Sequence, residues 1–271
     1  MRNPALVLGG FLVCAVSFIA IFAPWLSGHD PYAMDMSQRL MGPSPDHLLG
    51  TDNFGRDLWA RIALGARISL LVGLGSVSLS TAIGGVVGLL AGYFGGRVDA
   101  ILMRVVDLFL GFPPFILAMA LVAALDAGVW SVGIALVAVF WTEAARLVRA
   151  ITLSEAERDY VVAARAAGAG HTRILWCHLL PRVAGPLAIL SSLAIGTAIV
   201  AEAGLSFLGF GIQPPTPTWG WTLAYGMRFL RTDMWLATVP GLAIMLTVLG
   251  FNSLGDGLRD VLDPKGHARK T

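Results

Sequence analysis

Six stretches of this sequence contain no lysine, arginine, aspartate or glutamate, and they limit what the chain can fold into. The stretches are residues 3–28, 68–96, 108–125, 127–142, 183–201 and 234–255. A helix needs about 20 apolar residues to cross a bilayer. The fourth stretch is short, but its helix can continue through Ala144, Ala145, Leu147 and Val148. We therefore predict an all-α membrane protein with six transmembrane helices.

The composition agrees with a membrane protein. Charged residues make up 13% of the chain, about half of the roughly 25% typical of soluble domains. The formal charge of +2 argues against nucleic acid as a partner. Cys14 and Cys177 are far apart and indicate no disulfide framework. Arg2 precedes the first apolar run as in a signal peptide, but the run is long and lacks a small-residue cleavage site, so we expect a retained anchor.

The distribution of basic residues predicts the orientation, because cytoplasmic flanks carry the excess of lysine and arginine. One set of flanks holds thirteen: Arg2, Arg97, Arg104, Arg146, Arg149, Arg158, Arg165, Arg173, Arg182, Arg259, Lys265, Arg269 and Lys270. The other set holds six: Arg39, Arg56, Arg61, Arg67, Arg228 and Arg231. Both termini and the charged segment 157–182 should then be cytoplasmic, and loops 27–66 and 211–233 external.

Glycines recur at every fourth residue in the second apolar stretch, at Gly84, Gly88, Gly92 and Gly96. Such a stripe lets another backbone approach closely, as helices do in lipid. We predict a tight helix-packing seam, although the pattern does not identify its partner and glycine is common in membrane helices.

Three acidic residues lie near or within the spans. Asp107 follows Arg104 by three residues and Glu143 precedes Arg146 by three, so both could form local helix pairs. Glu202 has no basic neighbour in the sequence. Ionisable groups at membrane depth are often functional, and Glu202 could either line a substrate pathway or make a structural hydrogen bond.

No motif for catalysis, nucleotide binding or metal binding is recognisable. Lys265 and Lys270 are the two lysines, and neither follows a glycine-rich phosphate loop. His171, Cys177 and His178 match no familiar zinc spacing. We predict no catalytic residue, no metal and no cofactor in this chain.

The segment "ERDYVVAARAAGAGHTRILWCHLLPR", residues 157–182, is too polar to span and is available to a soluble partner. Its alanine-rich part favours a helix until Gly168 and Gly170 stop it. A short helix with small side chains can lie in another protein's groove, with Asp159 and Arg165 at the rim. The alternative is an ordinary amphipathic loop.

This segment resembles the "EAA" loop of permeases of ABC importers. That pattern is Glu-Ala-Ala, three residues, Gly, nine residues, Ile, one residue and Leu-Pro. Here Val162-Ala163-Ala164, Gly168 and Leu180-Pro181 stand at the matching distances. Val162 and His178 depart from the pattern's Glu and Ile. The resemblance implies an ATPase-docking site at Val162, Ala163, Ala164, Arg165, Gly168 and Pro181.

Four further motifs resemble the second permease subunit of dipeptide, oligopeptide and nickel importers. They are "LGTDNFGRDLWARIALGARISL", "FWTEAARLVR", "AEAGLSFLGFGIQPPTPTWG" and "LGDGLRDVLDP". The family implies a type I importer permease in the bacterial inner membrane. Its expected partners are a homologous permease, two ATPase subunits that bind ATP and Mg²⁺, an external substrate-binding protein and membrane lipid.

The resemblance also implies the organisation of the chain. Residues 1–66 should form the first transmembrane helix and an external loop, and residues 67–257 the permease domain with a cytoplasmic coupling loop at about 155–182. Residues 258–271 should form a cytoplasmic tail. A stand-alone secondary transporter is the alternative, but the inverted repeats or broken, charged helices typical of that class are not visible. The substrate stays open between peptides and nickel chelates, and we expect His29 and His47 to be solvated loop residues.

Overall fold

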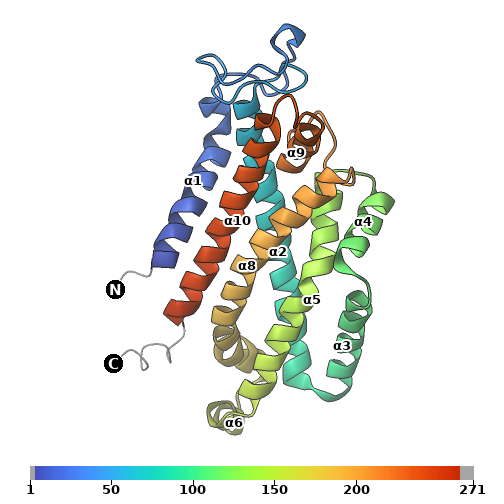
Figure 1. The fold of residues 1–271 in the computed structure, drawn as a ribbon. Coiled ribbons are helices and arrows are strands. Elements are labelled where there is room, and N and C mark those ends of the chain that lie inside the picture. The colour runs from blue at the N-terminus through green and yellow to red at the C-terminus, as the bar shows by residue number, and fades with distance from the viewer. Residues whose placement is uncertain (1–3, 263–271) are drawn as a thin grey trace.

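The computed structural model describes residues 4–262, and this part of the chain is built from helices (Figure 1). The long helices are α1 (Pro4–Leu26), α2 (Leu58–Phe94), α5 (Val129–Ala156), α8 (Leu180–Phe207) and α10 (Trp235–Leu262). The shorter ones are α3 (Gly96–Leu110), α4 (Pro114–Leu125), α6 (Asp159–Ala166), α7 (His171–Arg173) and α9 (Trp219–Arg228). A 3₁₀ turn covers Met36–Gln38, and a π-helical turn, Ile174–Leu179, leads into α8.

The six predicted spans correspond to five long apolar helices and one bent pair. The span predicted from the uncharged run 108–125 is the bent pair, in which α3 and α4 meet at an angle of 86°. Pro113 and Pro114 cause the break: proline lacks the amide hydrogen that a helix needs and disfavours helical geometry in the residue before it. The predicted tail is described only as far as Leu262. Residues 263–271, which include Lys265 and Lys270, lie outside the described part of the chain.

The second span is much longer than its uncharged run. The side chain of Asp57 accepts a hydrogen bond from the backbone N of Ala60 and caps α2, as aspartate does at helix starts. From there α2 runs without a break for 37 residues, about 55 Å at 1.5 Å per residue. It therefore extends beyond the hydrocarbon core of about 30 Å.

The helices pack in a bundle in which α1 lies along α10 and α2 along α5, with α8 between α10 and α5 (Figure 1). The loop 27–57 and α9 lie at one end, and α6 lies at the other. Pro4 and Leu262 lie toward the end that carries α6. The described ends of the chain thus share one side of the bundle, while the side of the membrane on which they lie stays a prediction.

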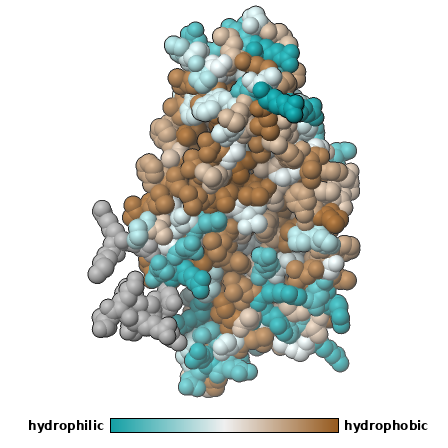
Figure 2. Space-filling model, viewed as in Figure 1, coloured by the Kyte–Doolittle hydropathy of each residue, from teal (hydrophilic) through white to brown (hydrophobic). Residues whose placement is uncertain are grey.

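Apolar side chains cover the middle of the molecule and polar residues gather toward its two ends (Figure 2). Many large apolar side chains are exposed, among them Phe11, Leu71 and Trp130, the last with 81% of its surface free. A soluble monomer rarely exposes so much contiguous apolar surface. The distribution fits a bundle whose sides contact lipid or another membrane subunit.

The glycine stripe of α2 faces α5. A Cβ atom added to Gly84 would lie 2.3 Å from the carbonyl oxygen of Trp141, and one on Gly88 would lie 2.5 Å from that of Ala145. At Gly92 it would meet the side chain of Thr152 at 2.7 Å. These distances are shorter than any carbon contact allows, so the two backbones touch only because the side chains are absent.

Gly96 does not belong to this seam, and its inclusion in the stripe is corrected here. Helix α2 ends at Phe94, and Gly95 and Gly96 both have positive φ, a conformation that L side chains rarely adopt. A Cβ atom on Gly96 would contact nothing within 4 Å. Glycines spaced by four residues share a face only within one helix, and α2 ends before Gly96.

We predict that Gly88→Ala destabilises the folded chain by about 1–3 kcal/mol, because the methyl group must push α5 away. Gly75→Ala is the matched control, since Gly75 lies on the same helix and an added Cβ would contact nothing within 4 Å. Alanine favours helix over glycine, so the control should be neutral or stabilising. Thermal unfolding of the purified variants in detergent measures both. Equal melting temperatures would contradict the seam.

The charge distribution predicts that residue 172 is cytoplasmic and residue 34 external. Thr172 and Met34 are both exposed, so single cysteines there should react with a membrane-impermeant reagent from opposite sides of the membrane. The native Cys14 and Cys177 are exposed too and must be replaced first. Labelling of both new cysteines from the same side would refute the six-span topology.

Candidate functional site

The charged segment folds into a short helix fixed at the end of the bundle. After α5 ends at Ala156, α6 covers Asp159–Ala166, which confirms the predicted helix. Val161 points inward and is fully buried in an apolar cluster with Leu89, Val148 and Ile174. Gly168 ends the segment with φ of 84°, a conformation that favours glycine. The cluster joins α6 to α2, α5 and the start of α8.

Much of the rest of α6 is open to solvent. Val162 is 51% exposed, and Ala163 and Arg165 are exposed as well, while Ala164 is half-buried. Pro181 is exposed but lies in the first turn of α8 and not on α6. The predicted docking residues are therefore accessible, and those on α6 form a small-residue surface with one arginine.

Polar contacts tie α6 to three longer helices. The hydroxyl of Tyr160 donates to Oε2 of Glu155 at 2.7 Å, and Nε of Arg182 lies 3.9 Å from the same oxygen. Burial and the neighbouring Glu155 carboxylate raise the pKa of Tyr160, so its hydroxyl keeps the proton that it donates. These contacts cross from α6 to the end of α5 and the start of α8.

A second set of contacts reaches α2. The guanidinium of Arg165 lies 5.7 Å from the ring centre of Tyr93, near the end of α2, within the range of a cation–π interaction. The hydroxyl of Tyr93 is 2.8 Å from Nδ1 of His171. Sequence reasoning missed Tyr93, because nothing in a single sequence signals contacts with residues as distant along the chain as Arg165 and His171. It also missed Tyr160, which belongs to no recognisable pattern.

The acids near the spans pair between helices and not along them. Asp107 of α3 accepts from Arg146 of α5 at 2.9 Å, and Asp99 accepts from Nη2 of Arg149 at 2.6 Å. The predicted pairing of Asp107 with Arg104 is thus wrong. Because α3 packs beside α5, the arginines of α5 reach acids that lie about forty or fifty residues earlier.

Glu202 is completely buried inside the bundle. Its two carboxylate oxygens accept hydrogen bonds from the hydroxyls of Ser69 and Ser206, each at 2.9 Å. Of the two alternatives left open by the sequence, the structure supports the hydrogen bond, which joins α8 to α2. Glu202 has no surface exposed to a pathway in this chain.

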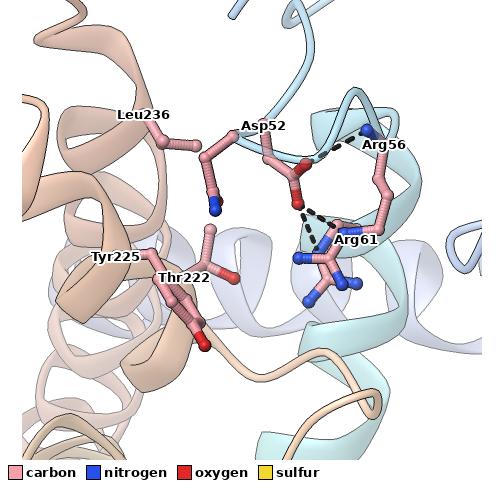
Figure 3. Close-up of a pocket in the computed structure, with 7 residues that line it drawn as sticks. Asp52, Arg56, Arg61, Thr222, Tyr225 and Leu236 are labelled. Carbon is pink, nitrogen blue, oxygen red and sulfur yellow. Dashed lines mark hydrogen bonds and ion pairs between the residues drawn. The ribbon is translucent and has the colours of Figure 1, made fainter. Parts of the chain in front are cut away.

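The loop of residues 27–57 is a fixed structure built around Asp52. The carboxylate of Asp52 contacts Nε of Arg56 at 2.7 Å and Nε of Arg61 at 3.4 Å, and all three side chains are buried (Figure 3). Arg61 also donates to the carbonyl oxygen of Pro31 at 3.1 Å. One carboxylate therefore holds the loop on the first turn of α2.

This ion-pair cluster borders a small cleft between the loop 27–57, α9 and the start of α10. Figure 3 shows Thr222, Tyr225 and Leu236 across the cleft from Asp52 and its arginines. Nearby, the indole of Trp219 donates to the carbonyl oxygen of Ile62 at 3.0 Å and is buried. The loop 27–57 and the segment 211–233 thus form one connected surface, which the predicted turns did not reveal.

His47 corrects another expectation. His29 is solvated in part, with 45% of its side chain exposed, but His47 is buried. Nδ1 of His47 lies 2.8 Å from Oδ2 of Asp57, and Nδ1 of His29 lies 3.9 Å from the same oxygen. The two histidines, 18 positions apart in the sequence, are neighbours because the loop folds back on the start of α2.

Two family models match the chain. Residues 84–266 match the binding-protein-dependent transport system inner membrane component, and residues 1–43 match the N-terminal TM domain of oligopeptide transport permease C.

Curated relatives align along almost the whole chain. The dipeptide transport system permease protein DppC of Escherichia coli is 47% identical over 97% of this chain and 90% of its own length. DppC of Alkalihalophilus pseudofirmus is 42% identical over 97% and 87%. The probable D,D-dipeptide transport system permease protein DdpC of Escherichia coli is 39% identical over 99% and 90%.

We predict that Asp52→Ala loosens the external loop, because it leaves two buried arginines without their carboxylate. Removing one partner of a buried ion pair costs about 3–5 kcal/mol. In vesicles whose outer surface carries loop 27–57, a protease added outside should cleave this loop much faster than in the wild type. Asp46→Ala is the control, because Asp46 belongs to the same loop and is exposed. Equal cleavage rates for the two variants would show that Asp52 does not hold the loop.

Proposed function

We propose a function from the premise that this chain belongs to the binding-protein-dependent transport system inner membrane components, a family of multi-pass proteins of the inner membrane. The chain is a permease subunit of an ATP-driven importer, and it forms half of a translocation pathway for short peptides. The ATP is bound and hydrolysed, with Mg²⁺, by separate subunits that dock on the coupling loop.

The choice of short peptides is supported by the relatives. DppC of Escherichia coli and DppC of Alkalihalophilus pseudofirmus are named for dipeptide transport, and DdpC for D,D-dipeptides. None of these three is named for nickel, so their names favour peptides over nickel chelates as the substrate. An external binding protein would deliver the peptide, and a second, homologous permease would form the other half of the pathway.

The division of the chain follows the same assignment. Residues 1–66 supply the first span and external loop, residues 67–257 the permease domain with the coupling loop at about 155–182, and residues 258–271 the tail. The binding protein would dock on the external surface around Asp52 and α9. The ATPase would dock at the opposite end, on α6.

The exposed face of α6 is the observation that carries the proposal. Val162 and Ala163 are open to a partner and Arg165 is exposed at the edge of this face, while Val161 on the other face is fixed in the apolar cluster. A protein that binds the exposed face of α6 would therefore move the buried face of the same helix. The inner face contacts α2, α5 and the start of α8, so three spans would move together.

The transport cycle then needs no chemistry in this chain. Closure of the two ATPases on ATP would draw the α6 helices of both permeases together, and the bundles would rotate as rigid bodies, as in other domain movements. The tight α2–α5 seam suits this role, because closely packed helices move as one unit. A stand-alone secondary transporter would instead work without the ATPase, and the family assignment does not favour it.

We predict that Ala163→Asp abolishes ATP-driven transport, because it places an unpaired carboxylate in the ATPase contact. A cost of about 3 kcal/mol for such a charge weakens docking by roughly a hundredfold. Uptake of a labelled dipeptide into proteoliposomes that contain the whole importer, together with substrate-stimulated ATP hydrolysis, measures the effect. Gly168→Asp is a poorer test, because its φ of 84° would add backbone strain.

Thr172→Asp is the matched control: Thr172 is exposed in the same cytoplasmic segment but lies beyond α6. It should leave uptake and hydrolysis close to wild type. Normal uptake by Ala163→Asp, at equal expression, would remove α6 as the docking site. Failure of the wild-type importer to take up any di- or tripeptide would instead remove the substrate class, so the two parts of the proposal are tested separately.

A further inference from the structure

Three potential metal ligands meet where the external loop touches the start of α2. They are His29, His47 and Asp57, and their ligand atoms all lie within 4.8 Å of one another. Oδ2 of Asp57 is 2.8 Å from Nδ1 of His47 and 3.9 Å from Nδ1 of His29. The rings of the two histidines are adjacent, with centres 4.9 Å apart.

These spacings suit a tetrahedral ion. Zn²⁺ binds imidazole nitrogen and carboxylate oxygen at about 2.0–2.1 Å, which places two ligands of a tetrahedron about 3.3 Å apart. The two distances to Oδ2 of Asp57, 2.8 and 3.9 Å, lie on either side of this value. Each of the two differs from it by about half an ångström, so the ligand atoms lie near the positions that a tetrahedral ion requires.

The neighbouring contacts already orient two of the ligands. Nε2 of His47 lies 2.6 Å from Oε1 of Gln38, which fixes the ring and directs Nδ1 toward Asp57. Oδ1 of Asp57 accepts from the backbone N of Ala60 at 2.7 Å, which leaves Oδ2 facing the two histidines. Metal-binding histidines commonly have their second nitrogen held in this way.

The charges and the access route also favour a cation. Two neutral imidazoles and one carboxylate give the site a net negative charge, and the nearby Arg56 and Arg61 contact Asp52 instead. His47 and Asp57 are buried, while His29 is partly exposed and gives the ion a route from solvent. Imidazole ligands select zinc and similar transition metals over Mg²⁺ or Ca²⁺.

We propose that His29, His47 and Asp57 bind one Zn²⁺ ion, with water as the fourth ligand. The ion joins residue 29, at the end of the first span, to residue 57, at the start of the second. It thus closes the external loop at its base, next to the surface built around Asp52. It is a structural ion of the permease and not its cargo, so the proposal does not depend on which substrate is carried.

The test uses the whole importer, purified with an affinity tag that contains no histidine and then stripped of metal. After addition of ZnCl₂ and removal of the excess, mass spectrometry should find one more zinc per complex in the wild type than in His29→Ala. Replacement by Co²⁺ should give the visible absorption typical of tetrahedral cobalt. His29→Ala is the decisive variant, because a partly exposed side chain can be removed without disturbing the fold.

His47→Ala should likewise lower zinc affinity, by at least about tenfold. His178→Ala, in the cytoplasmic segment, is the control and should bind zinc as the wild type does. Zinc should also slow proteolysis of loop 27–57 in the wild type and in His178→Ala, but not in His29→Ala. Equal zinc content and equal protection in the wild type and His29→Ala would overturn the proposal.

Discussion

The close approach of α2 and α5 is the contact on which the rest of the bundle depends. In a membrane, apolar side chains gain little by leaving lipid, so helices associate through close packing. Gly84, Gly88 and Gly92 allow the backbones to touch where any side chain would separate them. With this pair fixed, the arginines of α5 reach the acids of α3, and Ser69 of α2 reaches Glu202 of α8.

Both polar ends of the bundle follow one plan, in which a short structure sits on the end of a long helix. At the outer end, Asp52 and Asp57 hold the loop 27–57 on the first turn of α2. At the inner end, Val161 holds α6 against the apolar cluster, while Tyr93 contacts it from the last turn of α2. In the proposed importer, each end would offer a surface to a partner and would transfer that partner's force to the spans.

The sequence allowed the spans and α6 to be predicted, because hydrophobic runs and helix propensity act over short distances along the chain. It failed where distant residues meet. The pairing of Asp107 with Arg146 and the burial of His47 beside Asp57 depend on how helices and loops pack. The bend at Pro113 was not predicted, because the span was identified only from the absence of charge over 108–125.

The residues of the candidate site likewise fall into those that the sequence predicted and those that it did not. The resemblance carried by Ala163, Ala164 and Gly168 marked the proposed docking segment without any structure. The residues that anchor it, Val161, Tyr160 and Tyr93, carry no such pattern, because apolar and aromatic residues are common throughout the chain. For Glu202, the sequence left two roles open, and only the positions of Ser69 and Ser206 distinguished them.

The uninterrupted length of α2 has a mechanical consequence. This helix of 37 residues begins directly after Asp57, at the loop 27–57, and ends beside α6 at Tyr93 and Phe94. A continuous helix acts as a lever: tilting it by about 5° around its midpoint moves each end by roughly 2 Å in opposite directions. Arrival of a loaded binding protein outside and closure of the ATPases inside would then be two ends of one motion, with no relay of side-chain rearrangements between them.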